Sequence, residues 1–340
     1  MYDQILHMME SQKQTVSFYS RMESFDKFLQ RHNIYQKMYE ATPDVPVSFI
    51  WAISTHAPEI FAYQLGALAQ FPGIVQEDDE LVFVADVERR EDVLAVLGNI
   101  KDHVNAKIIF IRRGYPGDRP TLNWDIGLEY ATNDRVMCLR DLSMFMQPWD
   151  LINLARKTDI SNKLTSVSTI LGPVWSRFSD QWVFLCHPLY APTPYLFAFV
   201  ASKANIEQIN GFDRVLSRGF DHSGELDFLL RWGMNGFEFD ICDTTQVVHP
   251  GIPAVNMDVE QMKFHSSINR RYFMDRWGEE FISKLKPPLS LDLPLIEVND
   301  ALTLGPLMEV DTQDPDWPEY VKDVFTFAKI PSDRYIVEVV

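Results

Sequence analysis

Two parts of the sequence combine acidic and basic side chains in patterns that suit chemistry. Arg140 and Asp141 come directly after an apolar stretch of strand length. Further along, Glu225 and Asp227 precede Arg231 within a segment of helical periodicity. A carboxylate that follows a strand can ligate a hard cation, and a carboxylate at the start of a helix can act as a base. These residues therefore predict a site for a diphosphate, a metal ion and a catalytic base.

Glu225 is the candidate base. Ser223 is a candidate N-cap residue, so Glu225 is expected in the first helical turn, where the helix dipole favours the ionised carboxylate. Asp227 is a second candidate, about 200° further around the helix, and could instead pair with Arg231 one turn later. A helix-capping carboxylate without a catalytic role stays open as an alternative for Glu225.

The same helix carries small and apolar residues at helical spacing, which we expect to form its buried side and to leave Glu225 at the rim of a cleft. These residues are Leu226, Leu229, Leu230 and Gly233.

The elements that must position these residues alternate between strand and helix. Apolar runs predict strands at 45–53, 80–85, 107–111 and 135–139, and amphipathic patterns predict helices at 58–70, 91–103 and 125–133. Alternation of this kind predicts an α/β fold with a mainly parallel sheet and helices on both faces. Ligands of such sheets bind beyond the carboxyl ends of the strands.

Polar side chains follow several of these strands. Thr55 comes after the first strand, Asp86 ends the second, and Arg113 follows the third next to a Gly-rich turn. Asp86 could hydrogen-bond a nucleobase or ribose, and Arg113 could reach a phosphate. An ordinary strand-end carboxylate and a solvated turn arginine are the structural alternatives.

Length and charge limit the class of protein. A chain of 340 residues can bury a complete α/β core and carry extensions. Its net charge of −17 repels nucleic-acid backbones and anionic membranes, so general binding to either is disfavoured. The N-terminus lacks a signal-peptide pattern, no apolar run has the length of a membrane span, and the 3 cysteines have no metal-ligand spacing. A cytoplasmic protein with free thiols is expected.

Proline-containing stretches divide the chain into three predicted parts. Residues 1–43 form a helical extension that could be a homodimer surface, and residues 286–340 form an acidic, irregular C-terminal extension. Residues 44–285 form the main domain, with a nucleotide-binding half at 44–143 and an acceptor half at 144–285.

The main domain resembles family 2-type glycosyltransferases with a GT-A fold. The resemblance covers about residues 45–280 and lies in six segments that occur in the family's order: Ser54-Thr55-His56-Ala57-Pro58-Glu59, Ala85-Asp86, Asp125-Ile126-Gly127 through Ala131 to Leu139, Gly211-Phe212-Asp213, Glu225-Leu226-Asp227-Phe228 with Arg231, and Asn269-Arg270-Arg271-Tyr272-Phe273 with Arg276-Trp277-Gly278.

The resemblance implies a Rossmann-like sheet and a nucleoside diphosphate sugar as donor, with a uridine donor expected because it is common in the family. Thr55, Asp86 and Asp125 fall in the segments that would contact the donor. Mn²⁺ or Mg²⁺ would bridge the diphosphate, held by Asp141 and by His249, since related enzymes use a histidine at this position.

One motif departs from the family pattern. The family presents Asp-x-Asp after the fourth strand, whereas this chain has Arg140, Asp141 and Leu142. Metal could still bind through Asp141 with His249. Alternatively, Arg140 could neutralise the diphosphate directly and make a metal ion dispensable.

The resemblance favours an enzyme that transfers a sugar to an acceptor hydroxyl with inversion, on a glycan, a small molecule or a modified base. Two alternatives stay open: a non-catalytic relative that binds a nucleotide sugar or a protein, and an enzyme that glycosylates hydroxymethylated bases of viral DNA. A nucleotidyltransferase on a similar sheet is a more remote possibility.

Overall fold

A computed structural model describes residues 43–53, 65, 75–97, 105–111, 120–141, 144–145, 151, 153–176, 181–186, 196, 198–214, 216, 223–249, 269, 271–273, 275–278 and 336–339. The predicted N-terminal extension at 1–43 and the predicted helix at 58–70 lie outside the described residues, apart from Pro43 and Leu65.

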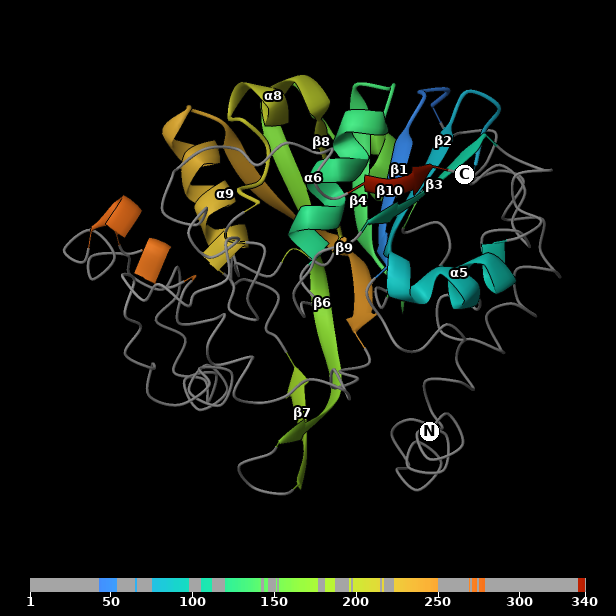
Figure 1. Ribbon diagram of the computed structural model, residues 1–340. Coiled ribbons are helices and arrows are strands. Elements are labelled where there is room, and N and C mark those ends of the chain that lie inside the picture. The colour runs from blue at the N-terminus through green and yellow to red at the C-terminus, as the bar shows by residue number, and fades with distance from the viewer. Residues whose placement is uncertain are drawn as a thin grey trace, which may run out of the picture.

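The described part is built on one mixed sheet (Figure 1). Its strands are β1 Ser48–Ile53, β2 Glu80–Asp86, β3 Ala106–Ile111, β4 Arg135–Arg140, β5 Met144–Phe145, β6 Lys163–Ser176, β7 Gln181–Cys186, β8 Ala198–Ser202, β9 Glu238–His249 and β10 Ile336–Val339.

The strand order is β10-β3-β2-β1-β4-β8-β6-β9-β5, and β7 pairs with β6 outside this path. Strands β1, β2, β3, β4, β6 and β9 run in one direction, and β5, β7, β8 and β10 run against them. The predicted mixed, mainly parallel sheet is confirmed.

Helices cover both faces of the sheet, as predicted. One face packs against α6 Pro120–Tyr130, α8 Lys203–Gln208 and α9 Ser223–Met234. The other face packs against α5 Arg90–Leu97, which follows the 3₁₀ turn Val87–Arg89, and against the π-helical turn Asn153–Lys157. Successive side chains of a strand point to opposite faces, so the apolar residues of β1 to β4 supply both cores.

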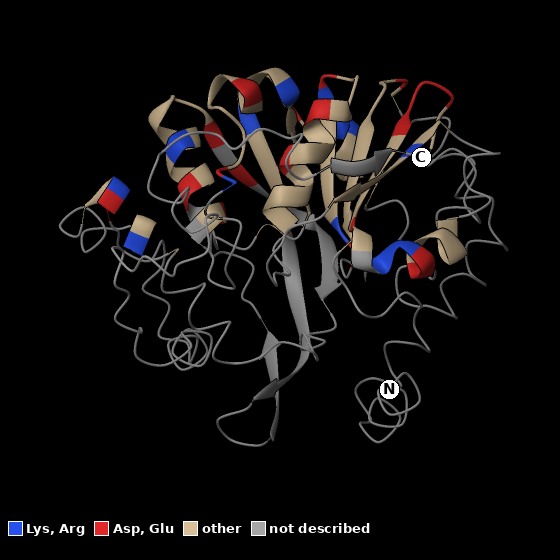
Figure 2. Cartoon of the chain, in the orientation of Figure 1, with Lys and Arg blue, Asp and Glu red and all other residues tan. Residues whose placement is uncertain are grey.

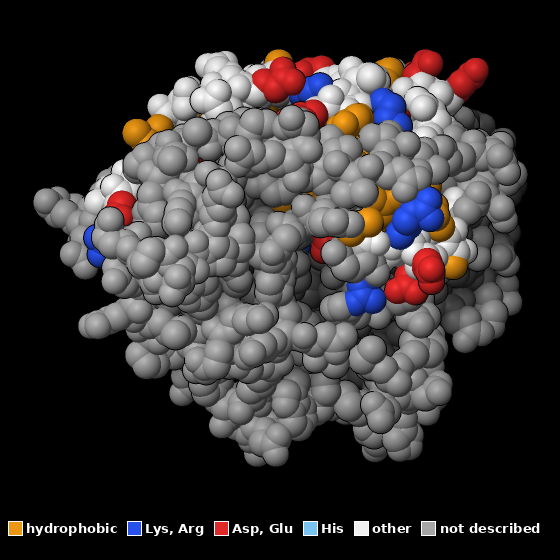
Figure 3. Space-filling model, viewed as in Figure 1, with side chains coloured by type: hydrophobic (Ala, Val, Ile, Leu, Met, Phe, Trp, Pro, Cys, Tyr) orange, Lys and Arg blue, Asp and Glu red, His pale blue; other side chains and the backbone are white. Residues whose placement is uncertain are grey.

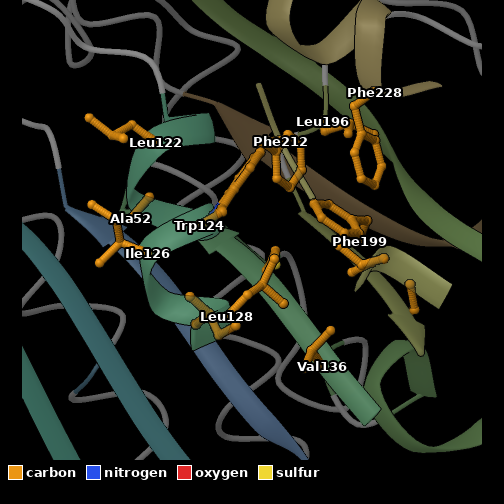
Figure 4. Packing of buried hydrophobic residues seen from close by; sticks show 14 of the residues in the cluster. Ala52, Leu122, Trp124, Ile126, Leu128, Val136, Leu196, Phe199, Phe212 and Phe228 are labelled. Carbon is orange, nitrogen blue, oxygen red and sulfur yellow. The ribbon is translucent and has the colours of Figure 1, made fainter. Parts of the chain in front are cut away.

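The core under α6 and α9 is aromatic (Figure 4). The rings of Phe212 and Phe228 stack with centroids 4.1 Å apart, and Trp124 meets Phe199 edge to face at 5.4 Å. Aromatic pairs in these arrangements add to the stabilisation that comes from area burial. The stack therefore joins α9 to the turn that contains Phe212 and, through Trp124, to α6.

Helix α6 lies unusually close to the sheet. It begins at Pro120 rather than at Asp125 as predicted, and proline is favoured in the first helical turn because it has no N–H to leave unpaired. A Cβ atom on Gly127 would lie 2.3 Å from the Ile50 Cγ2 atom, so only glycine allows this approach.

The predicted buried side of α9 is only partly correct, because Leu229 and Leu230 do pack against the core but are not its most buried residues. Gly233 is exposed and Leu229 and Leu230 are only half-buried, whereas Phe228 and Trp232 are fully buried. The reason is that the buried side is set by aromatic partners outside the helix, because Phe228 stacks on Phe212 and Trp232 packs against Phe237.

The C-terminal extension contributes more order than predicted, because β10 pairs antiparallel with the edge strand β3.

Charged side chains of the described part lie mainly on helices and turns, with both signs interspersed (Figures 2 and 3). None of the helices searched there is both long and apolar enough to cross a bilayer. Cys138 is a buried free thiol.

Candidate functional site

The first turn of α6 lies over the carboxyl ends of the parallel strands. The Trp124 indole N–H donates to the Leu139 carbonyl oxygen at 2.9 Å, near the end of β4, and the Asn123 amide donates to the Val84 carbonyl oxygen at 2.9 Å, near the end of β2. These hydrogen bonds hold the helix start at the edge of the sheet where an α/β fold binds its ligands.

Two candidate donor-binding residues end strands at this edge. Asp86 is the last residue of β2 and is half-buried, and Arg140 is the last residue of β4 and is 6% exposed. Asp86 lies two residues after Val84, and Arg140 lies two residues after Cys138. Because residues two apart in a strand share a face, both are on the face that packs against α6. Both residues therefore belong to the α6 side of the carboxyl edge.

Asp141 follows β4 directly and is fully buried. Its backbone N–H donates to the Ala52 carbonyl oxygen at 3.1 Å, which fixes it beside the end of β1. The chain then enters β5, where Met144 pairs with Val248 of β9. Because Met144 is only three residues after Asp141, their Cα atoms lie within about 11 Å of each other. The topology thus brings Asp141 and the end of β9, which is His249, to the same part of the molecule.

Glu225 lies in the first turn of α9, as predicted. The helix start is held against α6, since a Cβ atom on Gly224 would lie 3.4 Å from the Thr121 hydroxyl and 3.2 Å from the Leu216 carbonyl oxygen. Glu225 is only 1% exposed, so the expected position at an open rim is wrong. The contact with the first turn of α6 places it toward the edge that carries Arg140 and Asp141.

Asp125, a candidate donor ligand, holds a buried turn. Its Oδ1 atom accepts from the Phe212 N–H at 2.9 Å, and its Oδ2 atom accepts from Arg214 Nε at 2.6 Å. Burial alone would lower the pKa of Arg214, but the charges of Asp125 and Glu129 outweigh it and raise that pKa. Asp125 therefore connects α6 to the turn that precedes α9.

Asp227 is fully buried in a second charged cluster. Its Oδ2 atom accepts from Arg231 Nε at 2.8 Å, which confirms the predicted pair, and its Oδ1 atom accepts from the Trp277 indole N–H at 3.0 Å. Arg276 Nη1 lies 3.3 Å from the same Oδ1 atom. Burial raises the pKa of Asp227, although Arg231 and Arg276 oppose this shift.

Residues 269–278, the closing segment, contribute the rest of this cluster. Arg276 Nη1 donates to Asp213 Oδ2 at 2.6 Å, and the Tyr272 hydroxyl donates to the same atom at 3.0 Å. Burial and the Asp213 charge raise the pKa of Tyr272. The sequence showed these residues as separate motifs, and no local spacing indicated that they would meet.

Several predicted site residues are only partly placed. Thr55 and Arg113 lie outside the described residues, and for His249 only the backbone in β9 is described. Among the side chains that the structure describes, no group of three His, Cys, Asp or Glu residues could hold a metal ion.

No protein-family model matches the sequence, and no curated protein matches it. Among solved structures, the chain is similar to mannosyltransferase PcManGT from Pyrobaculum calidifontis in complex with GDP-Man and Mn²⁺, with 14% identity, coverage of 89% of this chain and 81% of that chain, and a TM-score of 0.45. It is also similar to GalNAc-T7 with UDP, GalNAc and Mn²⁺, with 11% identity, coverage of 76% and 54%, and a TM-score of 0.47.

A third similar structure is S. aureus TarS 1–349 in complex with UDP-GlcNAc, with 12% identity, coverage of 66% and 65%, and a TM-score of 0.44. Similarities at these identities and TM-scores do not identify an activity.

Proposed function

We propose that this chain is a glycosyltransferase of the GT-A, family 2 type that transfers a sugar from a nucleoside diphosphate sugar, UDP-sugar favoured, to an acceptor hydroxyl. The observation that supports it most is that the start of α6 is hydrogen-bonded to β2 and β4 near their carboxyl ends, and that α9 begins beside it. These two strands lead into Asp86, Arg140 and Asp141. Strand-end carboxylates at this edge suit the binding of a nucleotide and of the cation that would neutralise its phosphates.

In this proposal, Asp86 hydrogen-bonds the nucleoside, and Thr55 and Arg113 are further donor contacts. Asp125 is left out of the donor site because Phe212 and Arg214 engage both of its carboxylate oxygens.

Asp141 and His249 fit a divalent cation as a ligand pair, because Mn²⁺ and Mg²⁺ accept carboxylate oxygen and Mn²⁺ also accepts imidazole. The pairing of Met144 with Val248 supports this choice, because Asp141 and His249 are close to these two residues in the sequence. A bound cation would neutralise the diphosphate that leaves. Arg140 supplies a second positive charge from the same strand end.

Glu225 is the proposed base for an inverting transfer. The acceptor oxygen forms a bond to the anomeric carbon while the bond from that carbon to the diphosphate oxygen breaks. The acceptor proton passes to the Glu225 carboxylate, and the nucleoside diphosphate leaves with the electron pair of the broken bond. A positioned base of this kind contributes a factor of about 10² to 10⁴ to the rate.

Calorimetric titration with UDP, GDP and their common sugar conjugates tests the donor site, first with Mn²⁺ and then with EDTA. We expect binding that depends on the metal ion and weakens in Asp141→Asn. Tight binding that survives EDTA would shift the diphosphate contact to Arg140. Binding of none of these ligands would contradict the proposed function.

Replacement of Glu225 by Gln tests the base. Because Gln has a similar shape but cannot accept the proton, we expect transfer to fall by about 10² to 10⁴ while donor affinity changes little. Release of nucleoside diphosphate measures the reaction, whereas a nucleotidyltransferase would release pyrophosphate. A Glu225→Gln variant that transfers at the rate of the unmodified protein would remove Glu225 from this role.

The departure from Asp-x-Asp at Arg140, Asp141 and Leu142 favours one second candidate, a relative that binds a nucleotide sugar without transferring the sugar. Donor binding by calorimetry, combined with no release of nucleoside diphosphate for any donor and acceptor tested, would support this candidate.

A further inference from the structure

The closing segment contacts the surface on which α9 begins. The Asn269 amide nitrogen donates to the Leu216 carbonyl oxygen at 2.8 Å, and Asn269 is fully buried. Gly224 rests against the same carbonyl oxygen, since a Cβ atom there would lie 3.2 Å from it. Asn269 therefore fixes the Leu216 carbonyl group, against which Gly224 packs directly before Glu225.

The closing segment also contacts α9 just after Glu225. Trp277 and Arg276 both approach the Oδ1 atom of Asp227, which has no exposed surface. Arg276 bridges Asp227 and Asp213, with the latter contact at 2.6 Å. The Arg276 side chain is 28% exposed, but Asp227 has no exposed surface, so less water competes for this guanidinium than for an ion pair on the open surface.

Asp227 is poorly suited to react with a substrate in this arrangement. Its Oδ1 atom accepts from Trp277, and its Oδ2 atom accepts from Arg231. Arg231 also donates to the Ile209 carbonyl oxygen, so the same side chain holds α9 against the end of α8. These contacts engage both carboxylate oxygens of Asp227 within the protein, and they fix the helix.

We propose that the closing segment positions Glu225 by holding α9 on both sides of it, through Asn269 before it and through Arg276 and Asp227 after it. Asp227 is then a positioning residue and Glu225 the group that takes the proton, so the inference rests on the proposed function. A base displaced by about 1 Å can lose a factor of about 100 in rate.

The test compares two arginines of the closing segment. Arg276→Gln removes the charge that bridges Asp213 and Asp227. Arg271→Gln is the matched control, because Arg271 has a side chain 64% exposed and pairs only locally with Asp275 among the contacts observed here. The measurements are kcat, the donor KM, donor affinity by calorimetry, and hydrogen–deuterium exchange of amides at residues 224–228.

We expect Arg276→Gln to lower kcat by about 10- to 100-fold, to leave donor affinity within about threefold, and to speed amide exchange at the start of α9. Arg271→Gln should change none of these quantities. Arg276→Lys keeps the positive charge and should recover most of kcat. Asp227→Asn should resemble Arg276→Gln, and not Glu225→Gln, in the size of its loss.

Three results would overturn the inference: an unchanged kcat in Arg276→Gln, a loss of donor affinity as large as the loss of kcat, or equal exchange in the two arginine variants. If the unmodified protein transfers no sugar, the proposed function fails, and exchange alone then decides whether the closing segment holds the start of α9. If the amides at the start of α9 stay protected from exchange in Arg276→Gln, the closing segment does not hold this helix start.

Discussion

Asp86 and Asp141 are placed by the backbone of β2 and β4, whereas Glu225 is placed by a helix that buried charges hold. In the first region, which comprises β1 to β4 with α6, neutral hydrogen bonds from Asn123 and Trp124 and close apolar packing set the geometry. In the second region, the α9 region (the described residues of 211–216, 223–234 and 269–278), ion pairs recur. The Arg214–Asp125 pair is fully buried, whereas Arg231 and Arg276 are only partly buried.

The difference has an energetic consequence. A substitution in an apolar core destabilises the protein in proportion to the atoms that are removed or forced in. A substitution that removes one partner of a buried ion pair leaves an unpaired, desolvated charge, which is strongly destabilising. The α9 region should therefore respond strongly to charge changes. The β1–β4 region should respond mainly to changes of volume, except at the buried Glu80, which pairs with Lys107 at 2.8 Å. A proposed base benefits from this design, because charged contacts are directional and restrict the helix to one position.

The largest effect is expected from Arg214→Met. The substitution deprives the buried Asp125 carboxylate of the guanidinium that lies 2.6 Å away, so we expect a loss of about 3–5 kcal/mol in the free energy of unfolding. Urea denaturation measures it. Arg271→Met, at an exposed pair, is the control and should cost less than about 1 kcal/mol.

A loss below about 1 kcal/mol for Arg214→Met would contradict the idea that buried ion pairs hold the α9 region. A double variant with Asp125→Asn should recover part of the loss, because the carboxylate charge is then absent too.

Gly127→Ala should destabilise the β1–β4 region only through the volume of the added methyl group. The new methyl group would lie 2.3 Å from the Ile50 Cγ2 atom, and overpacking of this kind costs about 1–3 kcal/mol. Gly233→Ala is the matched control on α9, where a Cβ atom would meet nothing within 4 Å, so the better helix propensity of Ala should stabilise by up to about 1 kcal/mol. Equal effects in thermal denaturation would refute the close contact of α6.

The two regions also differ in how far the sequence predicted them. The strand ends at Asp86 and Asp141 were predicted because a short apolar run followed by a polar residue is a local signal. Asp125 was assigned to the donor from the family resemblance of its segment. Its pairing with Arg214 could not be predicted, because the two residues are 89 positions apart and no spacing reveals such a pair.

The buried side of α9 was predicted only in part for a similar reason. Counting Leu residues ignored the rings of Phe212 and Phe237, which come from outside the helix and select Phe228 and Trp232. Patterns within one element predict that element, whereas contacts between elements decide which of its faces is buried.

Two buried carboxylates, one in each region, should make stability depend on pH in opposite directions. Burial would raise the pKa of Glu80 in β2, but hydrogen bonds from Lys107, Thr132 and Ser48 outweigh it and lower that pKa below its ordinary value. Its stabilising contribution is therefore present above the pKa in the unfolded chain and is lost as pH falls through the folded-state pKa. The stability gap between the unmodified protein and Glu80→Gln should shrink on acidification from pH 7 toward pH 4.

Asp227 should behave in the opposite way. Burial raises its pKa despite Arg231 and Arg276, so the folded protein binds this proton more tightly than the unfolded chain does. The contribution is present below the unfolded-state pKa and is lost as pH rises through the folded-state pKa. Urea denaturation across this pH range should show the gap to Asp227→Asn growing on acidification while the gap to Glu80→Gln shrinks. If both gaps instead shrink on acidification, the effect of Arg231 and Arg276 on the pKa of Asp227 outweighs the effect of burial. The ion pairs would then stabilise the α9 region most when Asp227 is ionised.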